Sequence, residues 1–279
     1  NEIHSSINMI LGITAQNHDA SMALIDGDRI VWAAHSERYS RRKNDTMLDL
    51  DMVREMREYG EPTKIVWFEQ PCLKNLRRLY SGQRPWIVSP RDQLRLVGLN
   101  TLPVEYVKHH ESHAAAGFYT SSFKDASVLV VDAIGEWDTV SIWNANETGL
   151  KSVWNKRYPN SMGLFYTAFT QWLGLKPNEE EYILMGMAAY GNPDKYKAAI
   201  YEDFFAVING PEVKFKRNLH RGCPDWRLDL LREQDTFDLA AAVQQVYTEI
   251  LQGISRWARA NLPSRNIVLM GGCALNCVA

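Results

Sequence analysis

The sequence predicts an α/β protein with two related lobes. A pattern of strand, polar loop and hairpin occurs twice, first over residues 9–34 and again over residues 127–154, although the two copies share few side chains. Segments of helical spacing alternate with apolar strands in the rest of the chain. We therefore expect a first lobe at residues 9–125 and a second lobe at residues 126–279.

The composition indicates a soluble globular protein. The chain has 279 residues, of which 46% are hydrophobic and 23% charged. A formal net charge of -2 gives no general attraction for nucleic acid or anionic lipid, so we expect neither a nucleic-acid partner nor a membrane. The four cysteines are scattered and form no CxxC pair, which favours reduced thiols and a cytoplasmic location.

Residues 1–8 lack the basic start and the apolar middle of a signal peptide. We interpret them as a leader or tag remnant, with Met9 as the natural start.

The first lobe begins with strands and continues with alternating helix and strand. A turn at Asp26-Gly27-Asp28 joins two apolar runs and predicts a hairpin. The polar loop at 16–19 precedes this hairpin and can present side chains and amides to a ligand. Strands are expected at 9–14, 20–25, 29–34, 64–69 and 104–107, and a helix at 48–59.

The second lobe repeats the strand, loop and hairpin and then becomes mainly helical. Strands are expected at 127–132, 139–144, 150–154 and 266–270, and helices at 184–191, 194–205 and 236–260, whereas 161–175 is an aromatic, apolar segment. Gly191 is expected to end its helix, and Asp235 or Thr236 to cap the long helix. Residues 209–233 indicate an irregular insertion with short strands. A helix is expected to start at Ala274-Leu275-Asn276. Because the chain ends at Ala279, one turn into this helix, we expect the second lobe to be incomplete and the chain to be a fragment.

One stretch has the spacing of a metal site. His109 and His113 lie four residues apart at the start of an Ala-rich helical segment, so both imidazoles project from one face. Asp132 ends an apolar strand, where a ligand crevice usually opens. Two imidazoles and a carboxylate suit iron or zinc. The alternative is two ordinary histidines on a helix, and His110 points away from His109 by about a quarter-turn.

Three further motifs have a functional and an ordinary interpretation. Gly271-Gly272 lies between a strand and a predicted helix, which favours a phosphate loop, although glycine pairs often only form turns. The basic segment 38–43 is either solvated or binds an anion. Cys273 has no evident base and is interpreted as a small buried residue.

Several motifs occur in family order along nearly the whole chain and resemble the O-carbamoyltransferase family, which includes nodulation carbamoyltransferases and antibiotic-tailoring enzymes. They are HDAS at 18–21, SERYSRRK at 36–43, HHESHAAA at 109–116, GEWDT at 135–139, SMGLFYTAFT at 161–170, MGMAAYG at 185–191 and MGGCALNCVA at 270–279. The resemblance implies an actin-like fold of two ribonuclease-H-like lobes, with the second lobe truncated. It also relates the chain to the metalloprotein of tRNA threonylcarbamoyladenosine synthesis.

The resemblance further implies a two-step reaction. A YrdC-like domain, normally on the same chain, makes carbamoyladenylate from carbamoyl phosphate and ATP. The actin-like domain then transfers the carbamoyl group to a hydroxyl of a small-molecule or sugar acceptor. Only the second module is represented here, so the fragment alone is expected to be inactive for the full reaction.

The same resemblance implies residue roles. His109, His113 and Asp132 fall on the family's metal ligands, with iron as the expected ion and a fourth ligand beyond this sequence. Gly271, Gly272 and Asn276 would bind the nucleotide phosphate. His18 and Asp19 would orient or deprotonate the acceptor hydroxyl.

Two departures from the family pattern leave other functions open. Ala133 stands where the family has glycine, which would strain a turn of positive φ by about 1 kcal/mol. Ile183 stands where the family has a lysine, whose loss would weaken binding of an anion. The alternatives are another actin-like ATPase or kinase, or an inactive nucleotide-binding fragment.

Overall fold

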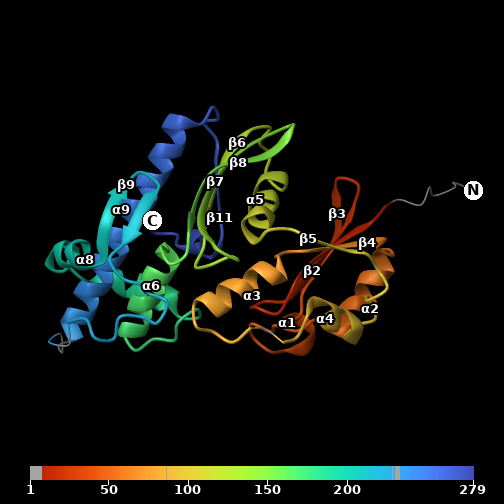
Figure 1. The fold of residues 1–279 in the computed structure, drawn as a ribbon, viewed down its shortest axis with the longest axis horizontal. Coiled ribbons are helices and arrows are strands. Elements are labelled where there is room, and N and C mark those ends of the chain that lie inside the picture. Colours follow the sequence, from red (N-terminus) through yellow and green to blue (C-terminus); the bar gives the residue numbers. More distant parts are fainter. Residues whose placement is uncertain (1–7, 86, 228, 230–232) are drawn as a thin grey trace, which may run out of the picture. The chain divides into compact units, whose positions relative to one another are not determined.

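A computed structural model describes residues 8–85, 87–227, 229 and 233–279. Most of the expected leader, residues 1–7, lies outside the described residues. The chain forms two compact units, the first ending at Ser112 and the second beginning at His113. Each unit contains one main sheet (Figure 1).

The first unit is built on a five-stranded sheet in the order β3-β2-β1-β4-β5. The first three strands are antiparallel, and β1, β4 and β5 are parallel. Gly27 has a φ of 60° in the predicted turn between β2 and β3. The strands are β1 Ile10–Thr14, β2 Ser21–Asp26, β3 Arg29–His35, β4 Lys64–Trp67 and β5 Val104–Tyr106. Every strand expected for this lobe is therefore confirmed.

Helix α2, Leu50–Tyr59, covers this sheet. Its N-cap Asp49 accepts hydrogen bonds from the backbone amides of Asp51 and Met52. The buried face of α2 presents Met52, Val53 and Met56 to the core of the first unit. The short helix α1, Glu37–Ser40, lies in the basic segment 38–43.

Two helices of the first unit, α3 Pro71–Tyr80 and α4 Pro90–Leu96, were not predicted. Helix α4 begins at a capping box in which the Ser89 side chain and the Asp92 side chain bond each other's backbone amides. This Ser-Pro-x-Asp pattern was the sequence signal that could have identified α4.

The second unit repeats the first four strand positions. Its sheet has the order β11-β6-β7-β8, with β6, β7 and β8 antiparallel and β11 parallel to β6. The strands are β6 Ala126–Val131, β7 Asp138–Asn146, β8 Gly149–Arg157 and β11 Ile267–Met270. Thus β6 corresponds to β1 and β11 to β4, which confirms the predicted repeat. The described part of this sheet has four strands where the first sheet has five.

Three helices of the second unit follow predicted helices with changed ends: α7 Glu181–Met187, α8 Lys197–Phe204 and α9 Glu233–Asn261. Helix α6, Met162–Trp172, forms in the aromatic, apolar segment 161–175, for which no helix was predicted. The predicted insertion 209–233 begins at the last residue of the short strand β9 Phe205–Asn209 and contains β10 Glu212–Phe215, and its residues 228 and 230–232 lie outside the described residues. Helix α9 buries its apolar face, including Val243, Val246 and Ile250, against the main core cluster.

One predicted helix end is wrong and one is confirmed. Asp235 and Thr236 lie inside α9, where Asp235 accepts hydrogen bonds from Lys195 and Tyr196. Gly191 ends the 3-10 helix Ala188–Tyr190 that continues α7, as predicted, although its backbone is extended, with φ -113° and ψ 167°. Glycine is needed there because a Cβ would lie 2.0 Å from the Phe237 carbonyl oxygen.

Helix α5, His109–Tyr119, packs with the second unit. Its Ala114 and Phe118 share a small core with Val128 and Val130 of β6 and Trp143 of β7. This packing explains why the second compact unit begins inside α5, whereas the sequence pattern predicted a boundary between residues 125 and 126.

No helix in the described part of the chain has the length and apolar character needed to cross a membrane.

Candidate functional site

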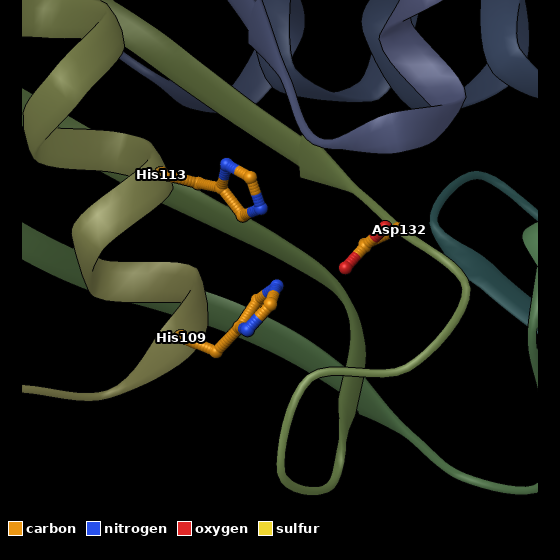
Figure 2. Close-up of side chains that lie close together, drawn as sticks. All are labelled: His109, His113 and Asp132. Carbon is orange, nitrogen blue, oxygen red and sulfur yellow. The ribbon is translucent and has the colours of Figure 1, made fainter. Parts of the chain in front are cut away.

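The two histidines of the predicted metal site lie on the first two turns of α5. Ala114 to Ala116 are strong helix formers and extend the helix that His109 begins. His109 and His113 project from the same side of α5 (Figure 2). His109 and His110 are both buried, and His113 is half-buried.

Asp132 brings a carboxylate to the two imidazoles. It follows the fully buried strand β6, and its side chain points toward His109 and His113 (Figure 2). One donor atom from each of the three side chains lies within 4.8 Å of the others. Among the described residues, this is the one group of three or more His, Cys, Asp or Glu side chains close enough to hold an ion.

The donor set fits a transition metal. Two ligand atoms bound at about 2.1 Å to one ion lie roughly 3–4 Å apart, so the trio needs to close by only about 1 Å. Two imidazoles and one carboxylate match iron(II) sites that leave positions open for substrate. His110 does not belong to the trio, as its helical position predicted.

The glycine turn after β11 reaches Asp132. Gly271 has a φ of 93°, and a Cβ there would lie 2.3 Å from the Val131 carbonyl oxygen. The backbone amide of Gly272 donates a hydrogen bond of 3.3 Å to Oδ1 of Asp132. Because β11 and β6 are parallel neighbours, the ends of both strands meet at one sheet edge. The predicted phosphate loop and the predicted metal ligand are therefore adjacent.

The expected helix after the glycine turn is a short 3-10 helix, Gly272–Leu275. Asn276 ends it, and its side-chain amide forms two hydrogen bonds with Gln244 of α9. Burial raises the pKa of the Cys273 thiol, and the Asp132 carboxylate raises it further. Cys273 is thus held as a neutral thiol. It is partly buried and packs against the main core cluster, so its interpretation as a small buried residue is confirmed in part.

Ala133 does not strain the loop after β6. It is not among the described residues with positive φ, so the cost expected from replacing the family glycine does not arise. Its backbone instead lies against α6, where a Cβ on Gly163 would be 2.5 Å from the Ala133 Cα atom. Ile183 lies half-buried on α7, and the effect of the missing lysine stays a prediction.

His18 and Asp19 lie in the loop between β1 and β2 of the first unit. His18 Nδ1 and Asp19 Oδ2 are 2.9 Å apart, and the His18 side chain is 70% exposed. Asp19 has a φ of 48°, in the left-handed region. Their assignment to the acceptor hydroxyl stays a prediction.

Comparison with solved structures identifies the fold class. The chain superposes on component A of (R)-2-hydroxyglutaryl-CoA dehydratase from Acidaminococcus fermentans with a TM-score of 0.50 and 12% identity, covering 97% of this chain and 85% of that one. Together with the repeated strand order, this likeness confirms the actin-like fold of two ribonuclease-H-like units.

Comparison of sequences identifies the family. Residues 78–279 match the family described as carbamoyltransferase N-terminus, and the chain belongs to it. An uncharacterised protein of Synechocystis sp. is 31% identical over 97% of this chain and 51% of its own length. Nodulation protein NolNO of Sinorhizobium fredii is 25% identical over 93% of this chain and 41% of its own length. The chain therefore spans about half the length of the curated relatives it matches, or less.

Two contributors near the site were not predicted from sequence. Gln244 and Tyr247 lie on the buried face of α9 and bond the segment after β11. The sequence does contain a signal for Gln244, which stands among the apolar residues Val243, Val246 and Ile250. An amide on an apolar helix face requires buried polar partners.

Proposed function

We propose that this chain is the transfer domain of an O-carbamoyltransferase, which moves the carbamoyl group of carbamoyladenylate to a hydroxyl of an acceptor. The observation that carries the proposal is the meeting of His109, His113 and Asp132 beside the glycine turn at one sheet edge. Membership of the carbamoyltransferase N-terminus family supports it.

We assign His109, His113 and Asp132 to one divalent cation, with iron as the expected ion. A cation bound there would supply Lewis-acid stabilisation of negative charge on an oxygen of the reacting group. The helix fixes both imidazoles on one face, and the end of β6 fixes the carboxylate, so the chain itself sets the ligand geometry.

Gly271 and Gly272 are assigned to the phosphate of the adenylate. Neither residue has a side chain, so a phosphate can approach their backbone amides closely. The hydrogen bond from the Gly272 amide to Asp132 Oδ1 supports this assignment, because it brings the backbone of the turn next to the proposed cation ligands. Asn276 belongs to the same turn.

The reaction is a substitution at the carbamoyl carbon. The acceptor oxygen forms a bond to that carbon, the bond between the carbon and the phosphate oxygen breaks, and AMP leaves with the electron pair. The hydroxyl proton passes to a base, for which we propose the hydrogen-bonded pair of His18 and Asp19. Carbamoyladenylate would come from ATP and carbamoyl phosphate on a YrdC-like domain, and the acceptor would be a small molecule or a sugar.

The test supplies carbamoyladenylate directly to the purified chain loaded with iron(II), without oxygen. Hydroxylamine replaces the acceptor, because it traps the carbamoyl group as hydroxyurea and needs no acceptor pocket. We expect AMP and hydroxyurea to form at least about 100-fold faster than with His113→Ala. His110→Asn, which alters the neighbouring imidazole, should retain the wild-type rate. An iron-loaded chain that releases AMP no faster than buffer would refute the proposal.

A further inference from the structure

We infer that Gln244 is a positioning residue for the cation site, which it influences through Asn276 and the glycine turn. The inference rests on the proposed cation function of His109, His113 and Asp132. It assigns a role to a residue on the buried face of α9 whose hydrogen bonds go to Tyr166, Thr248 and Asn276 rather than to the three proposed ligands.

Every hydrogen-bonding position of the Gln244 amide is used. Its Oε1 accepts from Asn276 Nδ2 at 2.9 Å and from the Tyr166 hydroxyl at 2.8 Å. Its Nε2 donates to Asn276 Oδ1 at 3.0 Å and to Thr248 Oγ1 at 3.2 Å. Since Gln244 is only 5% exposed, this complete set of partners fixes the amide in one orientation.

Helix α9 therefore holds the glycine turn at two points. Gln244 pairs with the Asn276 side chain, and Tyr247 donates its hydroxyl to the Cys273 carbonyl oxygen at 2.8 Å. Between these two points the chain makes the 3-10 helix that begins at Gly272. The position of Gly272 is thus set by α9 as well as by β11.

The opposite side of the turn contacts the cation ligand. The Gly272 amide bonds Asp132 Oδ1, and a Cβ on Gly272 would lie 3.1 Å from the same oxygen. A hydrogen bond to one carboxylate oxygen restricts rotation of the group and so directs the other oxygen. Figure 2 shows the Asp132 carboxylate directed at both imidazoles. A shift of the turn would therefore rotate the Asp132 carboxylate.

A purely structural role explains Gln244 less well. The neighbouring buried positions Val243, Val246 and Ile250 are apolar, and a leucine of similar volume would suit the same helix face. A buried amide contributes little net stability even when fully paired, but its directional bonds select one arrangement of its partners. The Asp132 carboxylate requires one fixed arrangement of the neighbouring turn to stay directed at the cation.

The test titrates Co²⁺, a visible-absorbing substitute for iron(II), into the 279-residue chain under anaerobic conditions. We expect Gln244→Leu and Asn276→Ala each to weaken Co²⁺ binding about tenfold and to alter the ligand-field spectrum. The double variant should bind no more weakly than the single variants, because both act through one contact. Gln245→Leu is the matched control, since Gln245 lies on the same helix but bonds Glu249 at 2.9 Å.

The outcomes separate this inference from the proposed function. If the wild-type chain binds no Co²⁺, or if His113→Ala binds it equally well, the proposed cation site fails. If binding depends on His113 while Gln244→Leu lowers only the melting temperature, Gln244 is merely structural and the inference is overturned. Additive losses in the double variant would also overturn it. If Gln244→Leu does not fold, Asn276→Ala decides the question. Wild-type Co²⁺ affinity and spectrum in that variant would overturn the inference.

Discussion

Gly163 lies where α6 passes the segment after β6, and it shows how closely packed the surroundings of the site are. A Cβ at this position would be 2.5 Å from Ala133 Cα, 2.8 Å from Ala133 N and 2.9 Å from Cys273 Sγ. The first two contacts are backbone atoms of the residue that follows Asp132. Only glycine lets the helix, the ligand-bearing segment and the glycine turn come together.

We predict opposite effects for two helical glycines. Gly163→Ala should lower the free energy of unfolding by about 1–3 kcal/mol, because the backbone of Ala133 must move. Gly253→Ala, in α9 with nothing within 4 Å of the added Cβ, should raise it by about 0.5–1 kcal/mol through helix propensity. Urea unfolding of both variants measures the difference. Equal changes in the free energy of unfolding of the two variants would show that the close approach at Gly163 does not affect stability.

At the scale of residues, the sequence predicts the trio but not its support. His109 and His113 are visible because helical spacing alone puts them on one face. Gln244 and Asn276 are 32 positions apart, and Tyr166 is 78 positions from Gln244. Such pairs arise only from tertiary packing. The local pattern indicates that the Gln244 amide needs buried partners, but it does not indicate which residues supply them.

At the scale of elements, the first turns of α9 carry an ionic cluster in which Asp235 and Asp238 are buried and Lys195 is exposed. Lys195 Nζ lies 2.6 Å from Asp235 Oδ1 and 3.0 Å from Asp238 Oδ2. Burial acts to raise the pKa of Asp238. Hydrogen bonds from the Asn192 amide, Gln234 and Lys195 outweigh it and hold that pKa below its ordinary value. The cluster thereby joins α9 to the segment that follows α7.

This cluster predicts a specific loss of stability in acid. Because the pKa of Asp238 is lower in the folded chain, its contribution is complete above the unfolded value of about 3.9 and is lost as the pH falls through the folded value. Asp238→Asn should cost about 1–2 kcal/mol at pH 7, and the difference from wild type should shrink below about pH 4. Unfolding curves from pH 7 to pH 3 measure this difference in stability.

The control is Asp225→Asn, which changes an exposed carboxylate whose partner is Arg217. It should change stability by less than about 0.5 kcal/mol. A difference between Asp238→Asn and wild type that is constant over this range would contradict the assignment.

Helix α3 shows why some elements escaped prediction. Its Leu73, Leu76 and Leu79 are exposed, whereas Lys74 and Arg77 are buried. Lys74 is paired with Glu69 at 2.6 Å, which allows the charge to be buried. This reversed pattern conflicts with the rule that apolar residues mark the buried face. The strands were predictable because their apolar runs and the Asp-Gly turn follow the ordinary rule.

At the scale of the whole molecule, one architecture is used twice with different loops. The first unit follows β1 with the loop that carries His18 and Asp19, and the second follows β6 with Asp132. The repeat was predictable from strand and turn patterns alone. The contact of the turn after β11 with Asp132 was not predictable in this way, because it depends on the pairing of β11 with β6 from opposite ends of the second unit. The chemistry that we propose requires both the repeat and this contact.

The most direct test of the account is the number and location of bound metal ions. Purified chain, reconstituted with iron(II) without oxygen and freed of excess metal, is analysed by elemental analysis together with His109→Ala, His113→Ala, Asp132→Asn and His110→Asn. Circular dichroism confirms that each variant is folded. We predict one ion per chain in wild type and His110→Asn, and less than about one-tenth of that in the three ligand variants. A wild-type chain without metal, or ligand variants that retain a full ion, would contradict the account.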